Sequence, residues 1–277
     1  MYRKVFLIIL FYHCIYYSLI FRNQSEKLSL LDHLNFEGSC SLRIFRNKYN
    51  YIKRDTVILV IPGGSYKYIA DHEGFPIMEK FFSYGYSGAI LNYKVGHGCY
   101  PANYIQGLKS IEYLSKKFKN IVLMGFSAGA HLAGLLGTTN RTQIPSVICM
   151  VLCYPVISFV EKPHEESVKY FLGNNYQNQE MRKNFSIENR VNENTIPTFI
   201  WTTRSDNIVS PENTFIMDES LKKKDVFHFV KIFDKGGHGL GLADANNNTI
   251  NKDVSRWTKM ADAFIEARIS DDYYRYV

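Results

Sequence analysis

The chain has 277 residues, of which 46% are hydrophobic and 21% charged, a composition typical of a globular protein with a sizeable core. The formal net charge is +7, but the basic residues are scattered, and short clusters such as Lys222–Lys224 are typical of helix ends. The aromatic-basic pattern of RNA-binding sheets is missing from the sequence, so we expect no nucleic-acid partner.

The N-terminal segment has a sequence pattern different from the rest of the chain. Arg3 and Lys4 precede an apolar run over residues 5–21. A basic start followed by an apolar stretch is typical of a secretory signal, whereas the length of this run reaches the lower limit for a membrane span. We expect residues 1–22 to be a hydrophobic leader, either a signal or an anchor, with burial in the fold as the alternative. The leader favours the secretory pathway or membrane association, and a cytoplasmic location is the remaining alternative.

From residue 56 onward, apolar strands alternate with amphipathic helices. The predicted strands are apolar runs bounded by turn residues, and they cover residues 56–61, 88–92, 121–124, 147–152, 198–202 and 226–233. The predicted helices carry apolar residues at helical spacing, and they cover residues 75–84, 103–118, 131–136 and 253–267. This alternation predicts an α/β fold over residues 28–277, with a mostly parallel central sheet flanked by helices on both faces.

The cysteines are Cys14, Cys40, Cys99, Cys149 and Cys153, without a C-x-x-C pair. Their irregular spacing predicts no disulfide framework and leaves a single Cys40–Cys99 bridge open. Cys149 and Cys153 fall in a predicted buried strand, where we expect them to pack in the core.

The pentapeptide Gly125-Phe126-Ser127-Ala128-Gly129 matches G-x-S-x-G. In this motif a serine stands on a strained turn between a strand and a helix, and small flanking residues relieve collisions with the neighbouring backbone. The pattern is common by chance, but a strand is predicted before it and a helix after it. We therefore predict Ser127 as a nucleophile; the alternative is a glycine-rich turn with an idle serine.

A serine hydroxyl needs a base, and the base needs an orienting carboxylate, in the chain order Ser, Asp or Glu, His. His238 follows the last predicted strand in a glycine-rich loop that can carry its imidazole over the serine. His228 lies inside the strand pattern and His164 in a polar segment, so we predict His238 as the base. Asp206 is the first carboxylate after the preceding strand and is the predicted acid; Asp234 is its rival, but lies too close to His238 in sequence.

The negative oxygen of a tetrahedral intermediate needs hydrogen-bond donors. One is expected from the amide of Ala128, directly after the nucleophile. Others are expected from the turn after residues 56–61, where glycine lets the backbone approach a substrate. We predict Gly64, Ser65 and Ala128 as the oxyanion hole; a simple turn is the alternative for the first two.

Several segments, spread along the chain, resemble those of a known protein family. In chain order they are PGGSY, HEGFP, LNYKV, GFSAGAHLA, SIENRV, TFIWTTRSDNIVSPENT and GGHGLGLA. Through them, over about residues 56–267, the chain resembles the bacterial-type feruloyl and acetylxylan esterase-like α/β-hydrolases. The resemblance implies carboxylesterase-like chemistry, with Ser127, Asp206 and His238 as nucleophile, acid and base.

The chain departs from this family at three positions. It has Ser65 and Ala130 where the family usually has glycine, and Ile187 where it has proline. A side chain at Ser65 is expected to reshape the oxyanion loop. The polar segment 158–195, helical around residues 165–172, is expected to be a small insert, either a cap above the site or a surface excursion.

These features predict a serine carboxylesterase that hydrolyses a small or medium acyl ester through an acyl-enzyme intermediate. An amide-directed hydrolase, either an arylformamidase or a small peptidase, is the alternative with the same machinery. A non-catalytic binding protein with a hydrolase fold is the alternative of another class. We expect a small-molecule ester as the substrate. The sequence contains no H-E-x-x-H cluster, so we expect no metal, and no cofactor is expected either. The oligomeric state is left open.

Overall fold

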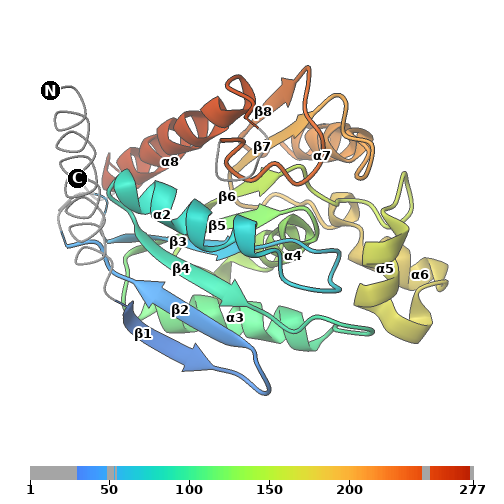
Figure 1. Cartoon of the computed structure of the whole chain (residues 1–277), viewed down its shortest axis with the longest axis horizontal. Helices are drawn as coiled ribbons and strands as arrows, with labels where there is room; N and C mark the ends of the chain where they lie inside the picture. The colour runs from blue at the N-terminus through green and yellow to red at the C-terminus, as the bar shows by residue number, and fades with distance from the viewer. Residues whose placement is uncertain (1–29, 49–52, 54, 245–249, 275–277) are drawn as a thin grey trace, which may run out of the picture.

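Within residues 30–48, 53, 55–244 and 250–274, which the computed structural model describes, the chain forms an eight-stranded sheet. The strands lie side by side in the order β1-β2-β4-β3-β5-β6-β7-β8 (Figure 1). Their bounds are β1 Leu30–Asn35, β2 Ser41–Phe45, β3 Thr56–Ile61, β4 Ser87–Asn92, β5 Asn120–Phe126, β6 Val147–Cys153, β7 Thr198–Thr203 and β8 His228–Phe233. β2 pairs antiparallel with β1 and β4, whereas the pairings from β4 through β8 are parallel.

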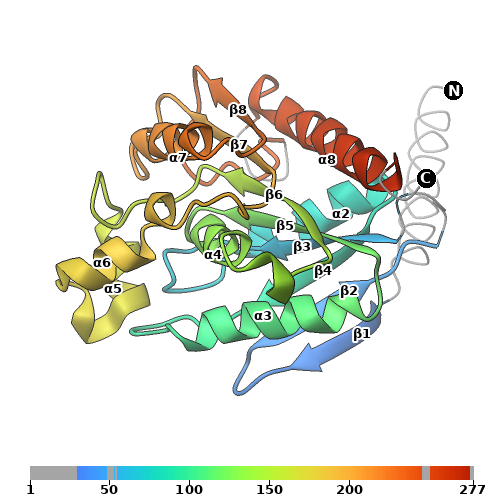
Figure 2. The ribbon, with the colours of Figure 1, turned by 180° about the vertical axis from the view of Figure 1, so that it is seen from behind.

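Helices cover both faces of the sheet, as the front and back views show (Figures 1 and 2). α2 (Phe75–Ser83) and α8 (Trp257–Tyr274) lie on one face. α3 (Ala102–Ser115), α4 (Ala128–Gly137) and α7 (Glu212–Lys223) lie on the other. The predicted layered α/β arrangement is thus present.

Side chains of the central strands alternate between the two faces. On β3, Ile58 and Val60 pack in the same cluster as α2 and α8, whereas Leu59 and Ile61 pack with α3 and α4. All four side chains are fully buried. Because both faces are covered, these strands are apolar throughout rather than alternating with polar residues.

The predicted central elements are found with small shifts at their ends. β8 begins at His228 instead of residue 226, because Val226 still donates its N–H to the Leu221 carbonyl of α7. α8 is preceded by the 3-10 helix η6 (Val254–Arg256), so its α-helical part begins later than predicted. The edge strands β1 and β2 and the helices α6 and α7 were not in the prediction.

The segment between β6 and β7 carries α5 (Glu165–Leu172), α6 (Gln179–Phe185) and the 3-10 helix η4 (Ile187–Asn189). α5 and α6 lie together beyond the carboxyl ends of the parallel strands (Figures 1 and 2). The bounds of α5 agree with the predicted helical stretch of the insert.

The leader predicted at residues 1–22 lies outside the described residues. Among those described, none of the helices has the length and apolarity to cross a membrane. Cys40 and Cys99 are buried free thiols, so the disulfide that the sequence left open is not formed. Cys149 and Cys153 are fully buried in the core, as predicted.

A first prediction concerns the start of α4. A Cβ on Gly129 would lie 2.1 Å from the Ile61 carbonyl oxygen and 2.3 Å from that of Pro62. We expect Gly129→Ala to lower the free energy of unfolding by about 3 kcal/mol or more, because neither backbone can yield. Chemical denaturation measures this loss. Gly237→Ala is the control, since nothing lies within 4 Å of its added Cβ; equal stability of the two variants would contradict the packing argument.

Candidate active site

Ser127 occupies the turn between β5 and α4. Its backbone has φ 52° and ψ −118°, a conformation that is strained for a residue with a side chain. The Ser127 N–H donates to the Cys153 carbonyl oxygen at 3.0 Å, and its own carbonyl accepts from Val156. These bonds to the end of β6 hold the turn, so that the hydroxyl stands at the carboxyl edge of the sheet.

The structure brings the three predicted side chains together in one hydrogen-bonded series. Ser127 Oγ lies 2.7 Å from His238 Nε2, and His238 Nδ1 lies 2.7 Å from Asp206 Oδ2. Since a carboxylate accepts, Nδ1 carries the proton and Nε2 presents its lone pair to the serine hydroxyl. The arrangement can therefore move a proton from Ser127 to His238.

Asp206 is fixed from two sides. Its other carboxylate oxygen, Oδ1, accepts 3.0 Å hydrogen bonds from the N–H groups of Ile208 and Val209. The Asp206 side chain is fully buried, so its orientation toward His238 is set by protein groups rather than by water. These bonds follow from its place just after β7, where the chain turns.

The alternative residues lie in other places. Asp234 is exposed and faces Arg204. His228 bonds Asp218 at 2.9 Å on the side of β8. His164 caps the N-terminus of α5 and bonds Ser167, and it lies near His238. Burial, and then the charge of His238, lowers the pKa of His164. Of the three histidines, only His238 bonds Ser127 and Asp206.

The loop after β3 runs beside the serine. A Cβ on Gly63 would lie 2.9 Å from Ser127 Cβ, which shows how closely the two segments approach. The Gly63 N–H is taken by Glu73 Oε2 at 2.8 Å. The N–H groups of Gly64 and Ser65 donate to no acceptor among the described residues. Ser65 has φ 57°, a backbone conformation that glycine adopts more readily than a residue with a side chain.

The family model BD-FAE matches residues 42–221, which is more than half of the chain. The chain belongs to the BD-FAE family.

Two curated relatives match about three quarters of this BD-FAE chain. Endo-1,4-beta-xylanase B of Butyrivibrio fibrisolvens is 30% identical over 76% of this chain and 36% of its own length. Acetylxylan esterase of Xylanibacter ruminicola is 26% identical over 74% of this chain and 46% of its own length. The chain thus spans between a third and a half of these curated relatives.

Solved structures share the fold over nearly their whole length. An acetyl ester-xyloside bifunctional hydrolase from Caldicellulosiruptor lactoaceticus is 34% identical, with a TM-score of 0.72 over 84% of this chain and 89% of that one. A carboxylesterase from Lactobacillus plantarum has a TM-score of 0.72 at 19% identity, covering 87% and 97% of the two chains. The predicted α/β-hydrolase fold and family resemblance are confirmed.

The insert of this BD-FAE chain contacts the candidate site. Glu166 of α5 forms a 3.1 Å ion pair with Lys67 in the loop after β3, and its carboxylate also interacts with the Ser65 hydroxyl. The carbonyl of Tyr170 accepts from the N–H of Gly98 at 2.8 Å. Two segments far apart in sequence therefore hold α5 next to the predicted oxyanion loop.

Two departures from the family pattern lie in η4 of the insert and in α4. Ile187 begins η4 and donates its N–H to the Ile157 carbonyl at 3.0 Å, a bond that proline could not make. Ala130 is fully buried, and its Cα would lie 2.5 Å from a Cβ on Gly125. Both residues fit the local backbone.

His131, one turn beyond Ser127, ties α4 to its surroundings. Its Nε2 donates to the Phe185 carbonyl at 2.7 Å, so its Nδ1 must accept from the Tyr66 hydroxyl, also at 2.7 Å. The ring stacks on Phe159 with a centroid distance of 4.2 Å. Burial lowers the pKa of His131 to about 3, so this histidine stays neutral and links the loop after β3 to α6.

Sequence reasoning missed the groups behind the site. Glu73, in the segment HEGFP, is 2% exposed and bonds both Gly63 and the hydroxyl of Tyr154. The segment contributes to the family resemblance, but nothing in its sequence indicates a buried carboxylate. His72 bonds the Gly239 carbonyl, next to His238, at 3.0 Å.

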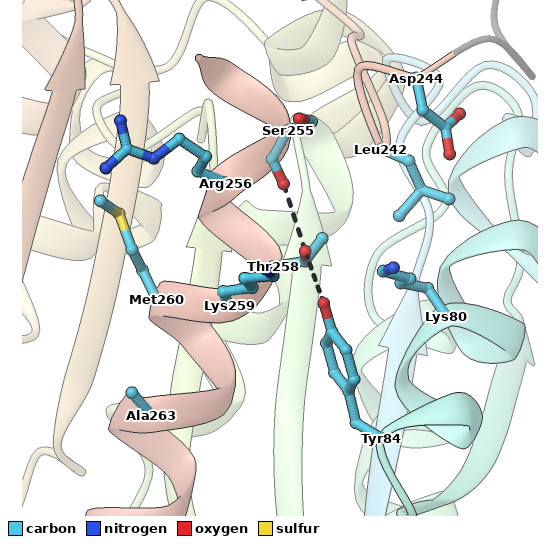
Figure 3. Close-up of a pocket in the computed structure, with 10 residues that line it drawn as sticks. All are labelled: Lys80, Tyr84, Leu242, Asp244, Ser255, Arg256, Thr258, Lys259, Met260 and Ala263. Atoms are coloured by element: carbon cyan, nitrogen blue, oxygen red, sulfur yellow. Dashed lines mark hydrogen bonds between the residues drawn. The ribbon is translucent and has the colours of Figure 1, made fainter. Parts of the chain in front are cut away.

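A groove of about 740 Å³ lies between α2 and α8 (Figure 3). Tyr84, directly after α2, bonds Thr258 of α8 at 3.0 Å across it, and Lys80 and Arg256 lie along its sides. None of the three residues of the hydrogen-bonded series lines this groove. It is therefore separate from the candidate active site.

The buried histidine yields a prediction about stability. Between the ordinary pKa of 6.5 and about 3, unfolded chains bind a proton at His131 that the folded chain does not. The free energy of unfolding should therefore fall with falling pH across this window, with a contribution of up to about 1.4 kcal/mol per pH unit. In His131→Gln, whose amide can still bond Tyr66 and Phe185, this contribution should vanish. Denaturant unfolding of both proteins between about pH 4 and 6 measures it, and equal slopes would contradict the assignment.

Proposed function

We propose that this chain is a serine carboxylesterase in which Ser127 is the nucleophile, His238 the base and Asp206 the orienting acid. The observation that carries the proposal is the continuous series of two 2.7 Å hydrogen bonds from Ser127 through His238 to Asp206. Geometry within hydrogen-bond reach is the first requirement for a general base. The names of the relatives, an acetylxylan esterase and an acetyl ester-xyloside hydrolase, favour a short acyl group.

The reaction follows from the positions of these groups. His238 Nε2 removes the proton of Ser127 as the serine oxygen attacks the acyl carbon. Asp206 stabilises the imidazolium without taking the proton. His238 then protonates the leaving alcohol, and water hydrolyses the acyl-enzyme with the same histidine as base.

The oxyanion donors in this proposal are the N–H groups of Gly64, Ser65 and Ala128. Those of Gly64 and Ser65 donate to no acceptor among the described residues. Ala128 is the first residue of α4, where an N–H has no partner within the helix. The positive end of the helix dipole adds to the stabilisation of a negative oxygen.

The proposal includes a role for the insert at residues 158–195 of the 28–277 domain. We assign it as a fixed wall of the substrate site. The Lys67–Glu166 ion pair and the bonds of His131 to Phe185 support this role, because they tie α5 and α6 to segments next to Ser127.

The main test is removal of the nucleophile. We expect Ser127→Ala to lower the rate constant for p-nitrophenyl acetate hydrolysis by about 10⁴-fold or more, and Asp206→Asn to have a similar effect. A fluorophosphonate probe should label the wild type and not Ser127→Ala. Ser115→Ala, at a partly exposed serine of α3 far from the site, is the matched control and should behave as wild type. Wild-type protein that neither hydrolyses the ester nor reacts with the probe would favour the non-catalytic binding protein instead.

A second test separates an esterase from an amide-directed hydrolase. The same series of residues can attack an amide, but the leaving amine then needs a proton before it departs. We expect the wild type to hydrolyse p-nitrophenyl acetate faster than an aryl formamide in initial-rate measurements at equal concentration. The reverse order of rates would replace the carboxylesterase with an arylformamidase.

A further inference from the structure

A buried carboxylate lies directly behind the candidate active site. Glu73 ends the 3-10 helix η1 (Asp71–Glu73) and is 2% exposed. Its Oε2 accepts the N–H of Gly63 at 2.8 Å, and its Oε1 accepts the hydroxyl of Tyr154 at 2.7 Å. A buried carboxyl group is tolerated only when hydrogen bonds compensate it, and here each of its two oxygens accepts one.

The bond to Gly63 reaches the loop of the proposed oxyanion donors. Gly63 directly precedes Gly64 and Ser65, and it packs against Ser127 so closely that a Cβ would lie 2.9 Å from Ser127 Cβ. A Cβ there would also lie 2.7 Å from Glu73 Oε2. Gly63, at the start of this loop, is thus packed closely against both the Glu73 carboxylate and Ser127.

The bond to Tyr154 reaches the loop that carries His238. Tyr154 is 1% exposed and directly follows β6. Its hydroxyl oxygen accepts the N–H of Gly241 at 2.9 Å, and its ring meets the His238 ring edge to face at 5.1 Å. Burial, together with the charge of Glu73, raises the pKa of the Tyr154 hydroxyl, so this group remains a donor toward the carboxylate.

A neighbouring residue adds a second contact to the same loop. The His72 ring donates from Nε2 to the Gly239 carbonyl oxygen at 3.0 Å. η1 therefore contacts the loop on both sides of Leu240, directly through His72 and indirectly through Glu73 and Tyr154. The segment HEGFP, which the proposed mechanism does not use, supplies both residues.

We propose that Glu73 is a positioning residue that fixes the distance between the oxyanion loop and the His238 loop, acting through Gly63 on one side and through Tyr154 and Gly241 on the other. The inference rests on the proposed serine esterase function, since it assigns the bridge to that site. Glu73 contacts none of the reacting atoms. Its effect is on geometry, and small displacements of catalytic groups change rates strongly.

The test uses two single variants and their combination in the full chain. Glutamine at position 73 offers one acceptor and one donor group where the site presents two donors, so Glu73→Gln should disturb the bridge at nearly constant volume. Tyr154→Phe keeps the ring on His238 but removes the link to Gly241. We expect each variant to lower kcat for p-nitrophenyl acetate by about tenfold to a hundredfold, with KM changed by less than about threefold.

The double variant separates a bridge from two independent effects. If Glu73 acts on Gly241 through Tyr154, the kcat of Glu73→Gln/Tyr154→Phe should be within about threefold of the more impaired single variant. If the losses in kcat of the two single variants multiply in the double variant, the proposed bridge is overturned. Labelling of Ser127 by the fluorophosphonate probe should slow in parallel with kcat.

Tyr86→Phe is the matched control. Tyr86 is also fully buried and donates to a carboxylate, Asp262, at 2.7 Å, but it lies among α2 and α8 instead of the site. Its kcat should stay within about twofold of wild type, and thermal unfolding of all variants checks that they are folded. If Glu73→Gln does not fold, Tyr154→Phe decides.

The outcomes distinguish this inference from the proposed function. A wild type that hydrolyses the ester and is labelled at Ser127, with both variants equal to it in kcat, would overturn the positioning role alone. A fall in kcat for Tyr86→Phe as large as for Tyr154→Phe would also overturn it, because the loss would then reflect general packing. A wild type without Ser127-dependent hydrolysis or labelling would overturn the proposed function, and the positioning role with it.

Discussion

The start of α4 packs directly against the end of β3, and the geometry of the whole site depends on this contact. Only glycine fits at position 129, where the carbonyl oxygens of Ile61 and Pro62 occupy the space of a side chain. The close approach places the turn after β3 beside Ser127. It also puts the first N–H groups of α4 next to that turn, which the proposed mechanism uses to stabilise a developing negative charge.

Strain at this contact is balanced by bonds from neighbouring strands. Ser127 has a positive φ and is held by Cys153 at the end of β6 and by Val156 just beyond it. Tyr154, between them, has φ 37° and is likewise held by the Trp201 carbonyl. Unfavourable backbone conformations persist only where surrounding structure determines them, and here they gather at one edge of the sheet.

The three hydrogen-bonded side chains come from segments that lie far apart in the sequence. Ser127, Asp206 and His238 each follow a strand, and the parallel pairing of β5 through β8 brings those strand ends to one edge. The chain order and the first-carboxylate rule were therefore enough to select them from the sequence. The insert could not be placed in this way, because its position depends on pairs such as Lys67–Glu166, whose partners lie in different segments.

The amino-acid sequence by itself determined the central strands, most of the helices that cover them and the residues of the proposed triad. Their patterns are local: apolar runs, helical spacing, and glycines around a serine. Tertiary structure alone decided that Glu73 is buried, that His131 is neutral and that Gly63 cannot donate to a substrate. Each of these depends on a partner distant in sequence, namely Tyr154 for Glu73, Phe185 for His131 and Glu73 for Gly63. The burial and hydrogen bonding of a polar group depend on its neighbours in space, and a single sequence does not identify those neighbours.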